Sequence, residues 1–129
     1  MKNLSFLALV IFIVFASCKK DEDPKITVIT PEEMQIFLEA DNVQLIDVRS
    51  QEQFNKGHIK GAQNIDFLSP TFFEDISKLD KDKPVYLYCH SGNRSAKCAE
   101  KMIEIGFIKI YDLDEGFSKW QHEGFDIQN

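Results

Sequence analysis

Short apolar runs and amphipathic segments alternate along most of this chain. Five runs predict β-strands, at Ile26–Ile29, Val43–Val48, Ala62–Asp66, Val85–Tyr88 and Ile108–Tyr111. The fourth run, VYLY, has no polar break, as is typical of a strand that is buried on both faces. Because the segments between the runs favour helices, this order predicts an α/β fold with a mostly parallel five-stranded sheet and helices on both faces.

The segments between the strands carry the signals of helix ends. The stretch TPEE forms a capping box in which Thr30 is the N-cap and Pro31 takes the first helical position. Further helices are expected from Ser50 to near Gly57, from Ser69 to about Ser77, from Ser95 to Ile105, and over 116–124. We expect Ser95 to cap its helix at the N-terminus and Gly106 to cap it at the C-terminus.

The first residues have the layout of a secretory signal peptide. Lys2 precedes an apolar run, Leu4–Ala16, and the small residue Ser17 follows it. This run of 13 residues is shorter than the roughly 20 residues that a helix needs to span a bilayer. We therefore expect a cleaved signal peptide over 1–17, with an uncleaved membrane anchor as the alternative.

Cys18 lies where a lipid would be attached. The stretch FASCKK resembles the lipobox of bacterial lipoproteins, in which the cysteine becomes the lipidated first residue, although Phe15 replaces the usual aliphatic residue. Several acyl chains give stable anchoring, and the charged residues up to Lys25 indicate a short disordered tether. We expect a lipidated tether over 18–25 and one domain over 26–129. The protein would then be anchored in the bacterial cell envelope, on the periplasmic side or at the cell surface of the outer membrane.

The charge balance limits the partners of the domain. The 129 residues carry a net charge of −6, and removal of Lys2 with the signal leaves 14 basic against 21 acidic residues. Because the sequence has no basic cluster, we expect no nucleic-acid partner, and an anionic lipid surface would repel the domain. Besides Cys18 only Cys89 and Cys98 occur, so we expect a domain that does not depend on disulfides. We also expect it to be a monomer.

The stretch YLYCHSGNRSAKC places Cys89 directly after the fourth predicted strand. Ligands of parallel sheets bind at the carboxyl ends of strands. The residues from His90 to Ser95 include no proline, so each keeps its backbone N–H, and Gly92 allows a positive φ. Such a loop can form an anion-binding nest at a helix N-terminus and, with the charge of Arg94, favour a thiolate or an anion carried on it. His90 is either a general base or a solvent-facing side chain.

Three other residues near this loop have structural explanations. Cys98 lies on the apolar face of its predicted helix, which indicates a core thiol, and a resolving thiol for Cys89 is the alternative. Asp47 and Arg49 lie at the end of the second predicted strand, and we expect an internal ion pair between them that supports the site. The cysteines and histidines lack the paired spacing of a zinc site, so no metal is expected.

Three segments together resemble the single-domain rhodaneses, a family of sulfurtransferases. Leu45–Asp66 is similar to the first signature of the family, Lys83–Phe107 to its active-site segment, and YDLDEGFSKWQHEGF to its closing motif. The resemblance covers about 29–127. One departure is Glu115, where many members have a second glycine, and this puts the local turn in doubt.

The resemblance implies a rhodanese-like three-layer fold and a transferase that needs no metal or organic cofactor. Cys89 would take a sulfane sulfur as a persulfide from a small sulfur-containing anion or a persulfide donor. It would then pass the sulfur to a thiophilic acceptor, namely cyanide, a thiol or a protein. The matching loop that would hold the sulfur consists of His90, Ser91, Gly92, Asn93, Arg94 and Ser95.

Two other classes of function remain open. One is a binding module with an idle cysteine, which the intact cysteine and the complete loop argue against. The other is a cysteine-dependent phosphatase or arsenate reductase on a related fold. Cysteine phosphatases have five residues between cysteine and arginine, whereas four separate Cys89 from Arg94. We expect the shorter loop to close around a single sulfur atom and not around a tetrahedral phosphoryl group.

Overall fold

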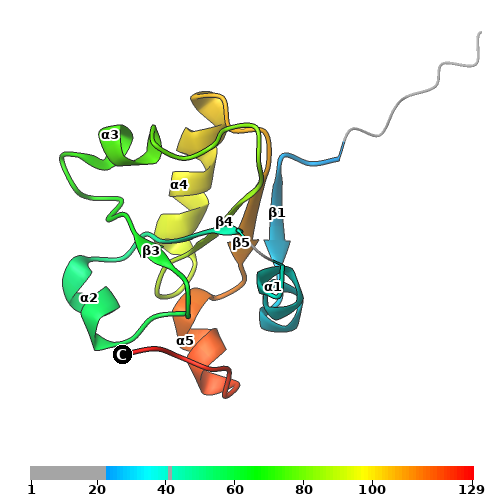
Figure 1. Cartoon of the computed structure of the whole chain (residues 1–129), viewed down its shortest axis with the longest axis vertical. Helices are drawn as coiled ribbons and strands as arrows, with labels where there is room; N and C mark the ends of the chain where they lie inside the picture. The colour runs from blue at the N-terminus through cyan, green and yellow to red at the C-terminus, as the bar shows by residue number, and fades with distance from the viewer. Residues whose placement is uncertain (1–22, 41) are drawn as a thin grey trace, which may run out of the picture.

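The computed structural model describes residues 23–40 and 42–129, in which strands and helices alternate as predicted (Figure 1). The strands are β1 (Ile26–Ile29), β2 (Gln44–Asp47), β3 (Gln63–Asn64), β4 (Val85–Tyr88) and β5 (Ile110–Leu113). The helices are α1 (Pro31–Leu38), α2 (Gln51–Lys56), α3 (Phe72–Ile76), α4 (Asn93–Glu104) and α5 (Gly116–His122).

The five strands form one sheet in the order β1-β5-β4-β2-β3, and each pairing is parallel. The middle strand is β4, in which Leu87 lies opposite Ile46 of β2 and Asp112 of β5. Because the strands run in the same direction, their carboxyl ends meet at one edge, where ligands bind in sheets of this type. The prediction of a mostly parallel five-stranded sheet is confirmed.

The side chains of β4 alternate between two apolar clusters, one on each face of the sheet. Val85 and Leu87 pack on the face covered by α3 and α4, whereas Tyr86 and Tyr88 pack on the face covered by α1 and α5. All four residues of the strand are buried. This alternation follows from the period of two along a strand, and it confirms the predicted arrangement of three layers.

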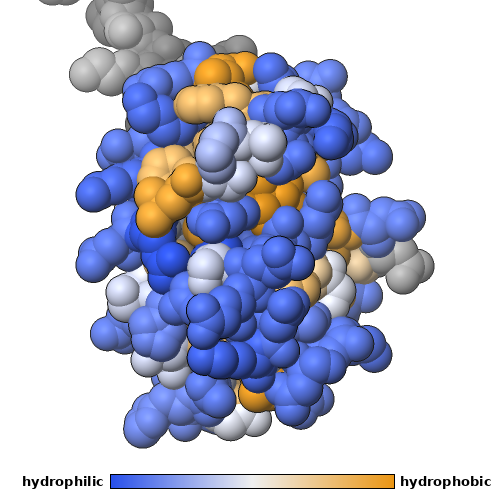
Figure 2. All heavy atoms as spheres, turned by 90° about the vertical axis from the view of Figure 1, so that its left-hand side faces the viewer, coloured by the Kyte–Doolittle hydropathy of each residue, from blue (hydrophilic) through white to orange (hydrophobic). Residues whose placement is uncertain are grey.

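The surface carries scattered apolar side chains. The face shown in Figure 2 is mainly hydrophilic, with apolar patches that hydrophilic side chains separate. Among the described residues, the large apolar side chains that are exposed come from different parts of the chain and are Val28, Ile36, Leu68, Phe73, Ile108 and Ile127. Apolar residues that are exposed singly are normal in soluble domains.

Strand β5 begins two residues later than the apolar run predicted. Ile108 is exposed, and its N–H donates to the Lys81 carbonyl at 3.1 Å in the turn that follows α4. Pairing with both β1 and β4 begins at Ile110. Asp112 interrupts the apolar pattern inside the strand, and for this reason the pattern misplaced the strand end.

Helices α3 and α4 also begin at other residues than predicted. α3 begins at Phe72, not Ser69, because the Thr71 N–H donates to Ser69 Oγ in a turn, at 3.2 Å. Gly92, with φ of +101°, is the N-cap of α4, and Ser95 lies inside the first helical turn. The prediction that Ser95 is the N-cap is wrong, because the positive φ of the glycine lets the loop enter the helix earlier.

The expected signal peptide and Cys18 fall on residues 1–22, which lie outside the described residues. The last residue of the expected tether belongs to the folded domain, because the Lys25 carbonyl accepts a hydrogen bond from the Ile110 N–H at 2.8 Å. In the described part of the chain, no helix is long and apolar enough to cross a membrane.

Candidate active site

Cys89 lies at the carboxyl end of β4, in the middle of the sheet edge. It follows Tyr88 directly and is 1% exposed. The loop after it turns at Gly92 into α4, which begins at Asn93. The thiol thus lies between the end of a buried strand and the N-terminus of a helix, where the sequence predicted it.

Hydrogen-bond donors surround the sulfur of Cys89. The Gly92 N–H donates to Sγ at 3.0 Å. Burial by itself raises the pKa of the Cys89 thiol. The hydroxyl and N–H of Ser95, followed by the N–H groups of Gly92 and Ser91, outweigh burial and hold this pKa below its ordinary value. The predicted nest of N–H groups is therefore present, and it stabilises a thiolate.

The N-terminus of α5 holds the other side of the loop. The Phe117 N–H donates to the Cys89 carbonyl at 2.8 Å, and the Ser118 N–H donates to the His90 carbonyl at 2.9 Å. Gly116 allows this close approach, since a Cβ there would lie 2.4 Å from the Cys89 carbonyl oxygen. The sequence singled out the closing motif, but this contact between the motif and the cysteine depends on the tertiary fold.

His90 lines an opening beside the loop, and Arg94 contacts Gln53, which lines the same opening. Arg94 Nη2 donates to Gln53 Oε1 of α2 at 3.1 Å, a contact that the sequence did not predict. His90 is exposed. A pocket of about 320 Å³ is lined by His90, Gln53, Arg49, Lys56, Gly57, Phe117, Gln121 and Ile127. The space beside the loop is therefore large enough for a small ligand.

Asp47 and Arg49 form the predicted buried ion pair, with Arg49 Nη2 at 2.6 Å from Asp47 Oδ2. Arg49 also donates to the Gly57 carbonyl at 2.7 Å, and its guanidinium lies 4.1 Å from the centre of the Phe117 ring. Because the Phe117 N–H binds the carbonyl of Cys89, the pair supports the loop indirectly, through α5.

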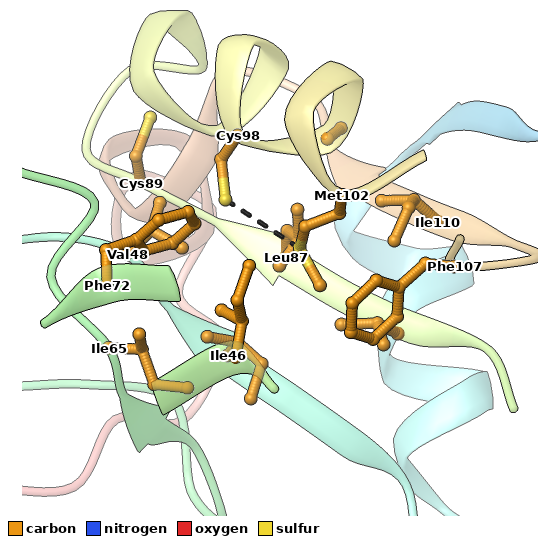
Figure 3. Close-up of a cluster of buried hydrophobic side chains, with 13 residues drawn as sticks. Ile46, Val48, Ile65, Phe72, Leu87, Cys89, Cys98, Met102, Phe107 and Ile110 are labelled. Atoms are coloured by element: carbon orange, nitrogen blue, oxygen red, sulfur yellow. Dashed lines mark hydrogen bonds between the residues drawn. The ribbon is translucent and has the colours of Figure 1, made fainter. Parts of the chain in front are cut away.

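Cys98 lies on the face of α4 that packs into the core. It is fully buried, and its Sγ donates to Met102 Sδ at 3.8 Å. Burial, followed by the charges of Asp112 and Cys89, raises the pKa of the Cys98 thiol to about 12. The side chains of the two cysteines point in opposite directions (Figure 3). The predicted core location is confirmed, and the thiol is protonated at neutral pH.

Asp112 of β5 is a buried acid that sequence reasoning missed. It is 4% exposed, and within the described part of the chain its Oδ1 has no hydrogen-bond partner. Burial raises the pKa of this carboxyl to about 6, with a smaller opposing effect of a hydrogen bond from Ser95. A signal was available, because Asp112 lies two residues after Ile110, on the same face of the strand, where a buried strand would have an apolar residue.

Comparison with known proteins identifies the family. A family model described as a rhodanese-like domain matches residues 30–123. The chain belongs to the rhodanese-like family. It is 41% identical to the thiosulfate sulfurtransferase GlpE of Shewanella oneidensis, over 66% of this chain and 81% of that protein. It is 38% identical to GlpE of Pseudomonas fluorescens, over 72% of this chain and 83% of that protein. The protein is thus a rhodanese-type transferase.

Solved structures of rhodanese-like proteins have the same fold. A rhodanese-related protein from Thermoplasma volcanium matches with a TM-score of 0.69 and 27% identity, over 78% of this chain and 96% of that one. A rhodanese-like domain protein from Staphylococcus aureus matches with a TM-score of 0.66 and 31% identity, over 80% and 99% of the two chains. These matches confirm the predicted fold class.

Proposed function

We propose that this rhodanese-like protein is a sulfurtransferase that carries sulfane sulfur as a persulfide on Cys89. The observation that carries the proposal is the set of donors at Sγ, with the Gly92 N–H at 3.0 Å and the Ser95 hydroxyl beside it. These donors favour the thiolate, which is the reactive form of a cysteine. The two GlpE relatives, which are named thiosulfate sulfurtransferases, support the same chemistry.

The proposed reaction has two steps. The Cys89 thiolate attacks the sulfane sulfur of a donor anion, so that an S–S bond forms and the bond between that sulfur and the donor breaks, with its electron pair leaving on the donor. An acceptor nucleophile (cyanide, a thiol or a protein thiol) then attacks the outer sulfur and releases the Cys89 thiolate. The outer sulfur lies about 2 Å from Sγ, where the N–H groups of Ser91 and Gly92 can stabilise its charge.

The two alternative functions predict different behaviour of the same loop. A binding module has no use for a thiol whose pKa is lowered by surrounding donors, so the environment of Cys89 favours an enzyme. A phosphatase must surround a tetrahedral phosphoryl group, whereas this loop has four residues between Cys89 and Arg94. The short loop and the buried sulfur favour an anion no larger than one sulfur atom on the thiol.

The test compares thiosulfate:cyanide sulfur transfer with aryl phosphate hydrolysis. We expect transfer by the wild-type protein and by Cys98→Ala, and none by Cys89→Ser. Intact-mass measurement after thiosulfate or polysulfide treatment should show the gain of one sulfur atom, which requires Cys89. Phosphate release that depends on Cys89, without a persulfide, would overturn the proposal. A protein that takes up no sulfur and hydrolyses no phosphate would be a binding module.

We also propose that Cys18 is the lipidated first residue of the mature protein and anchors the domain in the bacterial cell envelope. The apolar run Leu4–Ala16 and the stretch FASCKK support this proposal. Cys18→Ser should abolish acyl labelling and release the protein from membranes. A variant that is still cleaved normally and still retained on membranes would contradict lipidation.

A further inference from the structure

The Ser95 hydroxyl lies beneath the active-site loop and has three possible hydrogen-bond acceptors. Its Oγ donates to the Gly92 carbonyl at 3.2 Å, and hydrogen bonds of the same hydroxyl act to lower the pKa of the Cys89 thiol and that of the Asp112 carboxyl. Ser95 is 0% exposed. A hydroxyl has one proton, which rotates toward the acceptor that binds it most strongly. The three acceptors therefore compete for a single donor.

Of the three acceptors, the Asp112 carboxyl is the one that most requires this hydrogen bond. The carboxyl is buried on the face of the sheet that α4 covers, and its Oδ1 has no partner among the described residues. A buried carboxylate without hydrogen bonds is costly, so the group is stable only when it is protonated or when it draws a donor toward it. The Ser95 hydroxyl is the donor that acts on this carboxyl.

Within the described part of the chain, no cation contacts Asp112 and offsets the negative charge of its ionised carboxyl. Its partners in the sheet register are apolar, Val28 on β1 and Leu87 on β4. The titratable groups that act on it or are acted on by it are acids and thiols, namely Asp114 in the turn after its strand, Cys98 of α4 and, through Ser95, Cys89 after β4.

We propose that Asp112 is a positioning residue for sulfur transfer and acts on Cys89 through the Ser95 hydroxyl. The inference rests on the proposed role of Cys89 as the nucleophile. A protonated Asp112 donates to Ser95 Oγ and leaves the Ser95 proton for the thiolate. An ionised Asp112 takes the Ser95 proton, and the thiolate loses one of its donors.

The same contacts allow the two acidic groups to share one proton. Ser95 Oγ accepts the proton of the Cys89 thiol while its own proton moves to Asp112, so that a thiol and a carboxylate become a thiolate and a carboxylic acid. The total charge does not change, and no proton enters the water. The site therefore holds one negative charge, on the sulfur or on the carboxylate.

The test measures the rate of Cys89 alkylation by iodoacetamide against pH in the full chain, with the label located by peptide mass spectrometry. Asp112→Asn keeps a donor toward Ser95 but removes the competing charge. It should lower the pH midpoint of alkylation by about one pH unit, the effect of one hydrogen bond to a charged group. Asp82→Asn is the charge-matched control, since this exposed acid is not among the groups that act on Asp112 or Cys89; it should leave the midpoint near that of the wild type.

A double-mutant cycle tests whether the effect passes through Ser95. In a Ser95→Ala background, Asp112→Asn should shift the midpoint much less. A shift of the same size with and without Ser95, or no shift at all, would overturn the proposal. The outcome is independent of sulfur transfer: an Asp112-dependent midpoint in a protein that transfers no sulfur would refute only the proposed function.

A second measurement needs no variant of the buried pair. The carboxyl carbon of Asp112 can be titrated by NMR before and after alkylation of Cys89 in the wild-type protein. Alkylation removes the sulfur charge, and the titration midpoint of Asp112 should fall. An unchanged midpoint would show that the two groups are not coupled.

Discussion

Gly116→Ala tests how closely α5 must hold the active-site loop. The new Cβ would lie 2.4 Å from the carbonyl oxygen of Cys89 and 2.9 Å from that of His90. These are backbone atoms that cannot rotate away, so either the loop or the first turn of α5 must move. The hydrogen bonds from the Phe117 and Ser118 N–H groups, at 2.8 and 2.9 Å, are the contacts most directly strained.

The expected loss of stability has two parts. The φ of +61° at Gly116 costs an alanine about 1 kcal/mol. Weakening the two hydrogen bonds adds about 1–3 kcal/mol. The free energy of unfolding should therefore fall by about 2–4 kcal/mol. Gly124→Ala is the matched control, because Gly124 has φ of +82° with nothing within 4 Å of an added Cβ. Gly124→Ala should lose only the contribution of the positive φ, about 1 kcal/mol.

Denaturant unfolding measures the stability of both variants, and sulfur transfer is measured where both are folded. Gly116→Ala should lose transfer activity by about tenfold or more, because small displacements of a nucleophile are costly. Gly124→Ala should keep the wild-type rate. Equal losses in the two variants, or a wild-type rate in Gly116→Ala, would refute the view that this contact positions the thiol.

Four further changes have defined outcomes. Cys98→Ala should cost about 1 kcal/mol in unfolding free energy and leave sulfur transfer intact; a large loss of activity would favour a resolving thiol. Glu115→Gly should stabilise the protein by about 0.5–1 kcal/mol in denaturant unfolding, because φ of +53° strains a glutamate. Arg49→Met should destabilise it by about 3–5 kcal/mol, because the Asp47 charge stays buried without its partner. Burial raises the pKa of Asp112 to about 6, so the folded protein binds more protons than the unfolded chain between about pH 4 and 6. The free energy of unfolding should therefore fall as pH rises through this window, by at most about 3 kcal/mol for this group. Urea unfolding at several pH values measures this fall, which should be smaller in Asp112→Asn.

Much of the fold could be predicted because local signals agreed with the tertiary arrangement. The capping box is present, with the Glu33 N–H donating to Thr30 Oγ at 3.2 Å and the Thr30 N–H donating to Glu33 Oε2 at 2.8 Å. Gly106 follows the last residues of α4 with φ of +106°, as its predicted capping role requires. Signals of this kind involve residues a few positions apart, so they can be read without knowledge of the fold.

The loop around Cys89 could also be predicted, because the nest depends on backbone N–H groups and on one glycine. Any chain with these features after a buried strand can direct several N–H groups at the sulfur. The contacts that hold the loop from outside could not be predicted. Gln53 lies 41 residues from Arg94, and the amides of α5 reach the loop only through the packing of that helix on the sheet.

The two errors at the site have a common physical origin. Serine is favoured at helix N-caps, so local rules assign Ser95 that role, and an apolar residue is expected where Asp112 stands in a buried strand. In the structure the positive φ of Gly92 starts α4 before Ser95, and the Ser95 hydroxyl, inside the first turn, forms a hydrogen bond that acts on the Asp112 carboxyl. A carboxyl group in the core requires a hydrogen-bond donor. A serine inside the first helical turn has a hydroxyl proton that it can donate. Residues that depart from local rules are expected at functional sites, and the role that we propose for Asp112 and Ser95 agrees with this expectation.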